Sequence, residues 1–257
     1  MNIALIILAA GKGTRMQSEL PKVLHEVAGA PMLVHAMRAG RTLNPKRTII
    51  IAGHGFEAVS AAARTEDPEV GVVLQEEQLG TGHAVDQARA ALGDFDGTVI
   101  VLYGDCPLIQ SRTLENLSAT LSDSAVSVLG FEAKDPAQYG RLITDGDKLK
   151  RIVEFKDASP VERAVTLCNS GVMAASAELL FDLLSEIDTD NASGELYLTD
   201  IISKAVARGL PCTTVRCAEC ETLGVNSRVE LMRAEKEFQK LRRAEALEDG
   251  ITMLAPE

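Results

Sequence analysis

Glycine and cationic side chains lie close together near the start of the chain. Gly11, Gly13 and Arg15 directly follow an apolar run over residues 3–10, and Lys22 follows within the reach of one loop. Glycines let the backbone approach a ligand closely, and successive free N–H groups in such a turn form an anion-binding nest. Because the chain is otherwise acidic, these local cations predict a polyphosphate ligand.

The two common phosphate-binding motifs are excluded. A P-loop requires Gly-x4-Gly-Lys-Ser/Thr, which does not occur around Gly11 and Gly13. A dinucleotide fingerprint requires a third glycine where Met16 stands. It also requires an acidic residue at the end of the second strand, but residues 48–52 are followed by no carboxylate before Glu57. The polyphosphate site therefore belongs to another class.

Further polar side chains follow later apolar runs. Gln75 comes after residues 70–74 and offers both a donor and an acceptor, which suits the edge of a pyrimidine base. Asp105 comes shortly after residues 99–102. A carboxylate at that position favours a hard cation such as Mg²⁺, with a helix N-cap or turn residue as the alternative.

The order of elements predicts an α/β fold with a Rossmann-like, mostly parallel sheet flanked by helices, because short strands rich in Val, Ile and Leu alternate with helical patterns. Ligands of such sheets gather beyond the carboxyl ends of the strands. Asp145-Gly146-Asp147 predicts the turn of a small β-hairpin.

Strands are expected at residues 3–8, 48–52, 70–74, 99–103, 125–132, 141–143, 149–154, 169–174 and 213–216. Helices are expected at residues 32–42, 57–64, 82–92, 112–121, 177–184, 198–208 and 228–248.

Length and composition favour one large domain. The chain has 257 residues, of which 46% are apolar and 25% charged, and its net charge is −11. That charge argues against nucleic acid and anionic membranes as partners. The N-terminus shows no secretory pattern, and no apolar stretch is long enough to span a bilayer, so a cytoplasmic protein is expected. The cysteines, including Cys212, Cys217 and Cys220, are expected to be free thiols.

The motifs taken together resemble a known family. The string from Leu8 to Arg15, with Pro21-Lys22, resembles the signature of sugar-1-phosphate nucleotidyltransferases. With the later motifs it resembles the uridyltransferase domain of the bacterial bifunctional N-acetylglucosamine-1-phosphate uridyltransferase/glucosamine-1-phosphate acetyltransferase. Those later motifs are Gln75, Gln78-Leu-Gly-Thr-Gly-His-Ala84, Tyr103-Gly-Asp105, Tyr139-Gly-Arg141, Glu154, Lys156-Asp157, Asn169-Ser-Gly171, Glu195-Leu-Tyr-Leu-Thr-Asp200 and Gly224-Val-Asn226.

The resemblance implies a fold, an activity and a set of site residues. It implies the nucleotide-diphospho-sugar transferase fold over residues 1–227, followed over residues 228–257 by a long helix and the start of a linker to a left-handed β-helix acetyltransferase domain. Arg15 and Lys22 would bind the phosphates of UTP, and Asp105 and Asn226 would hold Mg²⁺. The uridine would be held by Leu8, Ala9, Ala10, Gly11, Gln75, Gly80 and Thr81. Gly140, Glu154, Asn169 and Thr199 would hold N-acetylglucosamine, and Tyr103 and Gly104 would line the site.

The implied reaction is attack of N-acetylglucosamine-1-phosphate on the α-phosphorus of UTP, which gives UDP-N-acetylglucosamine for peptidoglycan and lipopolysaccharide synthesis. The family is trimeric largely through its β-helix domain, which leaves a monomer open for this chain, and no acetyltransferase activity is expected from it alone. Two alternatives are a related transferase of other nucleotide or sugar specificity and a non-catalytic nucleotide-binding homologue. A glycosyltransferase is disfavoured because Asp-x-Asp is absent at Asp105.

Overall fold

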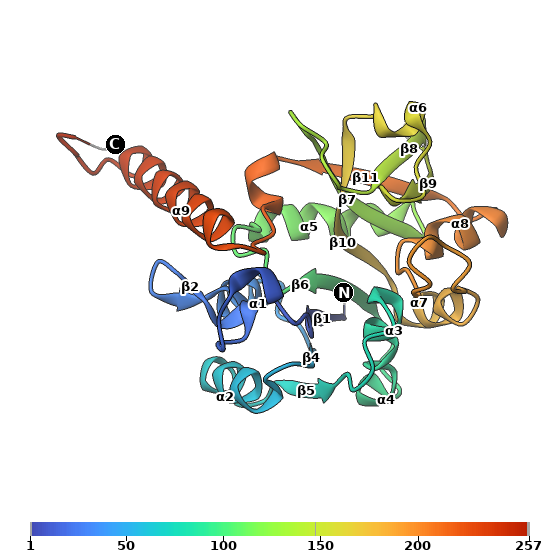
Figure 1. Cartoon of the computed structure of the whole chain (residues 1–257), viewed down its shortest axis with the longest axis horizontal. Coiled ribbons are helices and arrows are strands. Elements are labelled where there is room, and N and C mark those ends of the chain that lie inside the picture. The colour runs from blue at the N-terminus through green and yellow to red at the C-terminus, as the bar shows by residue number, and fades with distance from the viewer. Residues whose placement is uncertain (1, 147, 256–257) are drawn as a thin grey trace.

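The computed structural model describes residues 2–146 and 148–255, which form one large mixed sheet with helices on both faces (Figure 1). The strands of that sheet are β1 (Ile3–Ala9), β4 (Arg47–Ala52), β5 (Gly71–Leu74), β6 (Thr98–Tyr103), β7 (Val126–Glu132), β8 (Arg141–Asp145), β9 (Lys148–Val153), β10 (Leu167–Ser176) and β11 (Cys212–Cys217). The helices are α1 (Met32–Arg41), α2 (Phe56–Glu66), α3 (Thr81–Asp86), α4 (Arg89–Leu92), α5 (Ser111–Ala119), α6 (Pro160–Arg163), α7 (Ala177–Leu184), α8 (Asp200–Ala207) and α9 (Arg228–Glu248).

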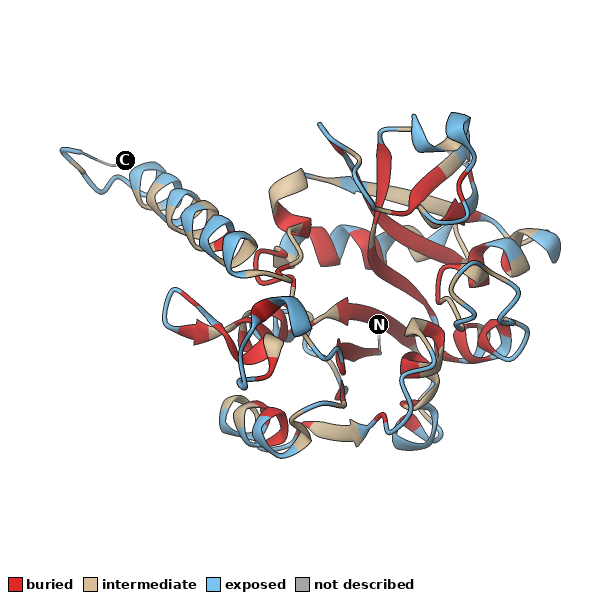
Figure 2. Cartoon of the chain, viewed as in Figure 1, coloured by how far each residue is buried: buried red, intermediate tan, exposed pale blue. Residues whose placement is uncertain are grey.

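Strand β1 lies inside the sheet and is buried along its whole length. Side chains alternate between the two faces of a strand. Accordingly, Leu5 and Ile7 belong to the apolar cluster under α1, α2 and α5, whereas Ile6 and Leu8 belong to the cluster under α3, α4, α7 and α8. Figure 2 shows the buried strands between these two layers of amphipathic helices. The near-continuous apolar sequence of β1 follows from this burial on both faces.

The direction of the strands differs from the prediction. The order is β5-β4-β1-β6-β10-β7-β11-β9-β8. The pairs β5–β4, β4–β1, β1–β6 and β7–β11 are parallel, whereas every pair made by β10 or β9 is antiparallel. The predicted mostly parallel sheet is therefore wrong for the sheet as a whole. It holds for the first half of the chain, where α-helical crossovers return each strand in the same direction.

Most predicted elements are present, with some differences at their ends. The bounds of α7 and α9 agree with the prediction. The single helix expected over residues 82–92 is two short helices, α3 and α4. The short strands β2 (Glu26–Val27) and β3 (Ala30–Pro31), and the helix α6, were not predicted. The β8–β9 hairpin is present, and Asp147 of its turn lies outside the described residues.

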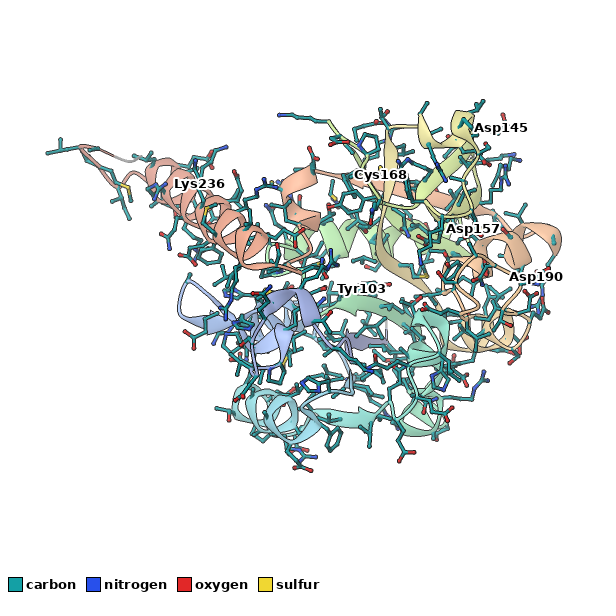
Figure 3. The ribbon with its side chains drawn as sticks, viewed as in Figure 1. Tyr103, Asp145, Asp157, Cys168, Asp190 and Lys236 are labelled. Carbon is teal, nitrogen blue, oxygen red and sulfur yellow. The ribbon has the colours of Figure 1, made fainter. Side chains whose placement is uncertain are left out.

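The first half of α9 packs against the rest of the molecule, and Leu241, Arg242 and Glu245 of its second half line a cavity with α1 and the segment before α5. Ala234 is buried against Met16 and Val225, and Leu231 and Phe238 are partly buried beside them. Figure 1 shows the helix leaving the body, and Figure 3 places Lys236 on this projecting helix. The apolar contacts of the helix therefore extend to Leu241, which is half-buried, whereas Ala244 is exposed.

Within residues 2–146 and 148–255, no helix combines the length and the apolar character needed to cross a bilayer.

Candidate active site

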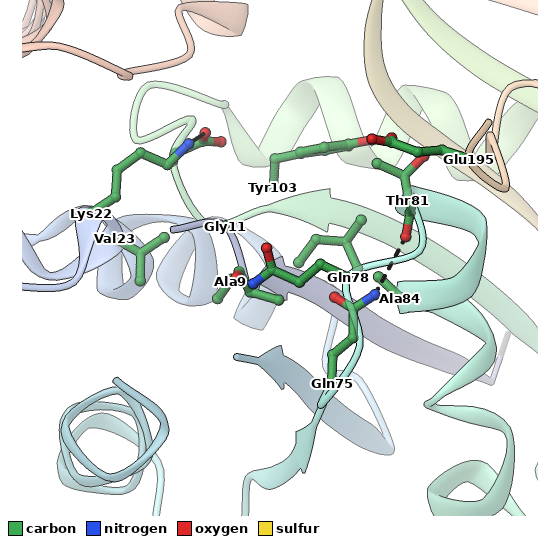
Figure 4. A pocket seen from close by; sticks show the side chains of 14 residues that line it. Ala9, Gly11, Lys22, Val23, Gln75, Gln78, Thr81, Ala84, Tyr103 and Glu195 are labelled. Atoms are coloured by element: carbon green, nitrogen blue, oxygen red, sulfur yellow. Dashed lines mark hydrogen bonds and ion pairs between the residues drawn. The ribbon is translucent and has the colours of Figure 1, made fainter. Parts of the chain in front are cut away.

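A cavity of about 320 Å³ lies at the carboxyl edge of the parallel strands, as predicted. Its walls come from the segments that follow β1, β5 and β6, together with the start of α3. The lining residues are Leu8, Ala9, Ala10, Gly11, Lys22, Val23, Gln75, Gln78, Gly80, Thr81, Ala84, Tyr103, Asp105 and Glu195. In Figure 4, Lys22 lies on one side of the cavity, Thr81 and Glu195 on the other, and Tyr103 between them.

The Lys22 ammonium lies between two oxygen ligands at one end of the cavity. It forms an ion pair with the Asp105 carboxylate and donates a hydrogen bond of 2.9 Å to Asn226 Oδ1. The backbone connects the same residues, because the Val225 N–H donates to the Asp105 carbonyl at 3.0 Å. Two oxygens from segments far apart in the sequence thus converge on one positive charge.

This donor set fits a divalent cation. Carboxylate and amide oxygens are hard ligands of the kind that Mg²⁺ prefers, and Mg²⁺ usually takes only one or two protein carboxylates plus waters and phosphates. Asp105 and Asn226 already converge on the position of a cation. Among the described residues no group of three or more His, Cys, Asp or Glu side chains is arranged to hold a metal ion.

The glycine turn after β1 packs closely against the loop that carries Lys22. Gly13 has a φ of +60°, and a Cβ atom built on it would lie 2.6 Å from Lys22 Cβ. Glycine is required there both for its backbone conformation and for this close approach. Arg15 is on the short 3₁₀ helix that follows (Thr14–Met16), where its side chain is exposed and does not line the cavity.

Two glutamine amides line the cavity away from Lys22. Gln75 is buried, and its Nε2 contacts the Gly80 carbonyl at 3.4 Å and His83 Nδ1 at 3.0 Å. Gln78 Nε2 donates to the Ala10 carbonyl at 2.6 Å. These contacts fix the orientation of both amides, and they tie the segment after β5 to the segment after β1.

The turn that leads into α3 lies against the loop that precedes α8. The Leu196 N–H donates to the Leu79 carbonyl at 2.8 Å, and the Gly82 N–H donates to the Leu196 carbonyl at 2.8 Å. Gly80 has a φ of +118°, and a Cβ atom on it would lie 2.5 Å from the Leu196 carbonyl oxygen. The two loops can approach this closely only because Gly80 has no side chain.

Tyr103 connects this cavity to a second group of predicted site residues. Figure 3 places it near the middle of the molecule. Its ring lies on Gly171 of β10, where a Cβ atom would come within 2.5 Å of Tyr103 Cε2. Burial raises the pKa of Tyr103, and the carboxylates of Glu154 and Asp105 raise it further. Tyr103 therefore remains a neutral phenol in the physiological range.

The four residues expected to hold the sugar form one chain of contacts. Thr199 Oγ1 donates to Glu154 Oε1 at 3.1 Å. A Cβ atom on Gly140 would lie 3.3 Å from the Glu154 carboxylate, and the Asn169 N–H donates to the Gly140 carbonyl at 2.8 Å. Burial raises the pKa of Glu154, which the hydrogen bond from Thr199 opposes. Glu154 lines a neighbouring cavity of about 260 Å³ rather than the one described above.

Three residues of the predicted motifs have evident structural roles. Asn169 Oδ1 accepts a hydrogen bond of 3.0 Å from the Gly171 N–H where β10 changes register. Arg141 is fully buried and donates to the backbone carbonyls of Tyr139, Ala137 and Arg163. Gly104 is buried between β1 and α1, with its N–H donating to the Leu8 carbonyl at 2.9 Å.

The cysteines act as small buried or half-buried side chains. Burial raises the pKa of Cys106 well above its usual range, and the Asp105 carboxylate adds to this. Burial also raises the pKa of Cys212 to about 11 and of Cys217 to about 12. These values disfavour thiolates, as expected for structural thiols.

Four cavity residues were not among the predicted site residues, namely Val23, Gln78, Ala84 and Glu195. Gln78, Ala84 and Glu195 lie within the motifs that carry the family resemblance, and Gln78 is in addition a second amide three residues after Gln75. Val23 is an apolar wall residue without a distinguishing pattern.

The fold and the cavity define an α/β nucleotidyltransferase. The structure superposes with a TM-score of 0.75 on a UDP-glucose pyrophosphorylase in complex with UDP-glucose, at 18% identity, covering 94% of this chain and 100% of that one. The chain belongs to the MobA-like NTP transferase domain family, whose model matches residues 5–187.

Bacterial relatives agree with the family resemblance expected from the motifs. The chain is 60% identical over 257 residues to the bifunctional protein GlmU of Ruegeria sp. (strain TM1040), and equally to that of Ruegeria pomeroyi. Both matches cover all of this chain and 57% of the relative. The chain thus spans little more than half the length of these relatives.

Proposed function

We propose that this chain transfers a uridylyl group from UTP to N-acetylglucosamine-1-phosphate, giving UDP-N-acetylglucosamine and pyrophosphate. The observation that carries the proposal is the convergence of Lys22, Asp105 and Asn226 at one end of a cavity that a glycine turn and two fixed amides complete. The similarity to GlmU proteins supports the choice of substrates. The product would supply peptidoglycan and lipopolysaccharide synthesis in the cytoplasm.

The reaction would be an in-line displacement at the α-phosphorus of UTP. An oxygen of the sugar phosphate forms the new bond, the bond between the α-phosphorus and its bridging oxygen breaks, and pyrophosphate leaves with that oxygen. The nucleophile is already an anion, so no general base is required. The barrier therefore comes from charge repulsion and alignment, which Lys22, Arg15 and the glycine turn would reduce.

Asp105 and Asn226 would hold Mg²⁺, which supplies charge neutralisation and orientation of phosphate oxygens. The Lys22 ammonium contacts both of these oxygens. We infer that bound phosphates draw Lys22 toward themselves, since an ammonium is a compact charge on a flexible stem. The two ligand oxygens then face the nucleotide instead of Lys22.

Gln75 would select uracil. Its Nε2 already contacts the Gly80 carbonyl and His83 Nδ1, so its carbonyl oxygen is the group offered to a base. Uracil presents an N3–H donor to such an acceptor, whereas cytosine presents an unprotonated N3. The amide orientation thus favours UTP over CTP.

The sugar would be held by the contact chain of Gly140, Glu154, Asn169 and Thr199. Glu154 is an acceptor for sugar hydroxyls, and Tyr103 separates this group from the nucleotide cavity. Residues 1–227 would form the nucleotidyltransferase domain, which the helix starting at Arg228 follows.

A substrate panel with pyrophosphate release as the readout tests the proposal. UTP, CTP and GTP are each combined with Mg²⁺ and either N-acetylglucosamine-1-phosphate or glucose-1-phosphate, and Asp105→Asn serves as the inactive control. We expect the highest kcat/KM with UTP and N-acetylglucosamine-1-phosphate. A preference for another nucleotide or sugar phosphate, or nucleotide binding without turnover, would overturn it.

A further inference from the structure

The first turn of α9 contacts the candidate site through a carboxylate that the proposed reaction does not use. Glu230 Oε2 accepts a hydrogen bond of 2.7 Å from the Asn226 N–H, and the Glu230 N–H donates to Ser227 Oγ at 3.3 Å. In the usual capping box the carboxylate would return to the N–H of the N-cap residue itself. Here it holds the residue before the N-cap, Asn226, whose Oδ1 contacts Lys22.

A cation on the same turn contacts the two loops that carry Arg15 and Lys22. Arg228 Nε donates to the Met16 carbonyl at 3.2 Å, and Arg228 Nη1 lies 3.3 Å from His25 Nδ1. Met16 directly follows Arg15, and the His25 N–H donates to the Lys22 carbonyl at 3.2 Å. The guanidinium therefore contacts both loops that carry the cations expected to bind phosphates.

An apolar cluster supports these polar contacts. Met16, Val225 and Ala234 are buried together, so the glycine-turn loop, the segment before Asn226 and α9 share one small core. Val225 also donates its N–H to the carbonyl of Asp105. The start of α9 is thus the place where the elements bearing Asp105, Asn226, Arg15 and Lys22 meet.

We propose that Glu230 and Arg228 are positioning residues that fix Asn226 Oδ1 relative to Asp105 and to the two phosphate-side loops. This inference rests on the proposed function, in which Asn226 is a metal ligand. Residues that hold a metal ligand in place typically contribute about 10- to 100-fold to metal affinity or activity. The effect should therefore appear in the Mg²⁺ dependence and not only in stability.

The test compares Glu230→Ala with Glu230→Gln and with the matched control Glu237→Ala. The glutamine keeps an oxygen that can accept from the Asn226 N–H, whereas Glu237 lies two turns along the same helix and pairs with Lys240 at 3.7 Å. We expect Glu230→Ala to raise the Mg²⁺ concentration for half-maximal pyrophosphate release about 10-fold or more. Glu230→Gln and Glu237→Ala should stay close to the unsubstituted chain.

Binding of Mn²⁺ in the presence of UTP, followed by electron paramagnetic resonance, gives a readout without turnover. Glu230→Ala and Arg228→Met should weaken it, while the control Arg233→Met should not. Glu230→Ala could instead melt at a lower temperature but keep the Mg²⁺ dependence and Mn²⁺ affinity of the unsubstituted chain. Glu230 would then act only as a helix cap, and the inference would be overturned. If the unsubstituted chain releases no pyrophosphate, the proposed function fails. Mn²⁺ binding then still tests whether Glu230 and Arg228 position Asn226.

Discussion

The Lys22 ammonium pairs with the Asp105 carboxylate at one end of the candidate active site. Lys22 is largely buried, and so is its partner Asp105. Both residues are followed by apolar side chains, Val23 and Cys106, that keep the pair in the wall of the cavity. In the proposed reaction the same ammonium would neutralise a phosphate of bound UTP.

Lys22→Ala is expected to lower turnover about 100-fold, on the scale seen when one stabiliser of transition-state charge is removed. Steady-state kinetics of pyrophosphate release at saturating UTP and Mg²⁺ measures this. Lys46→Ala, which removes an exposed lysine far from the cavity, is the control. Turnover equal to that of the unsubstituted chain would contradict the role of Lys22.

Glu154→Gln is expected to stabilise the chain at neutral pH while weakening use of the sugar phosphate. Burial raises the pKa of Glu154 above its ordinary value of 4.5. Below pH 4.5 the carboxyl is protonated in the folded and unfolded chain alike. As the pH rises from 4.5 to the raised pKa of the folded chain, the unfolded chain loses this proton before the folded chain does. Over that range the unsubstituted chain loses stability that the glutamine variant keeps.

Urea unfolding of the two chains at neutral pH and near pH 4.5 measures this difference. The stability advantage of Glu154→Gln should be present at neutral pH and shrink toward pH 4.5. A stability advantage of the same size at both pH values, or a variant that is less stable at neutral pH, would show that burial of the ionised Glu154 carboxylate does not destabilise the folded chain.

At the residue scale, the sequence indicates the chemistry better than the packing. Gln75 and Asp105 reach the cavity because each closely follows an apolar strand, and Lys22 reaches it because its loop packs against the glycine turn after β1. The role of Glu230 could not be predicted, since its contact with the Asn226 N–H depends on how α9 begins. A charged residue in the first turn of a helix is ordinarily only a favourable interaction with the helix dipole.

At the element scale, the site depends on the contact between the turn before α3 and the loop before α8. Their backbones are joined by the two Leu196 hydrogen bonds, and Leu198 adds a third from its N–H to Thr81 Oγ1 at 3.1 Å. The loop that brings Thr199 to the sugar side is thus held by the turn that would hold the uridine. The contact between these two loops would therefore support the binding of both substrates.

Gly80→Ala is expected to separate these loops and to destabilise the chain by about 1–3 kcal/mol, because a Cβ atom there meets backbone that cannot yield. Gly194→Ala is the matched control: its φ is +64°, but a Cβ atom there meets nothing within 4 Å. Urea unfolding and the KM values for both substrates measure the effect. Equal losses in the two variants would mean that the backbone conformation, and not the contact with Leu196, matters.

Element positions could be predicted well and strand directions only in part. The apolar runs place β1, β4, β6 and the helices between them, because burial on both sheet faces leaves a clear pattern. Strand β10 has the same kind of sequence, but it inserts between β6 and β7 in the opposite direction. Direction depends on the length and path of the connections, which hydrophobicity patterns do not record.

At the scale of the whole molecule, α9 divides into a part that builds the site and a part that extends away from it. The apolar cluster of α9 ends at Phe238, and beyond it Leu241, Arg242 and Glu245 only line a cavity beside α1 and the start of α5. The sequence predicts one continuous helix over residues 228–248 and does not show where its packing changes. The number of residues that a helix buries is set by the partner surface as well as by its own pattern.

Two truncations test this division. A chain that ends after Arg243 should keep the activity and melting temperature of the full chain, because Leu231, Ala234 and Phe238 remain. A chain that ends after Asn226 should lose activity, since it lacks Arg228, Glu230 and the apolar contacts of α9. Loss of activity in the longer truncation product would place a functional role in the exposed half of the helix.

The central claim is that the cavity directs attack of a sugar phosphate on the α-phosphorus of UTP. Phosphorus NMR of the full chain with UTP, Mg²⁺ and N-acetylglucosamine-1-phosphate follows every phosphorus atom in one sample. We expect pyrophosphate and the diphosphate diester of UDP-N-acetylglucosamine to appear in equal amounts as UTP disappears. Release of inorganic phosphate and UDP would contradict the claim. So would UTP that stays unchanged although the protein is folded.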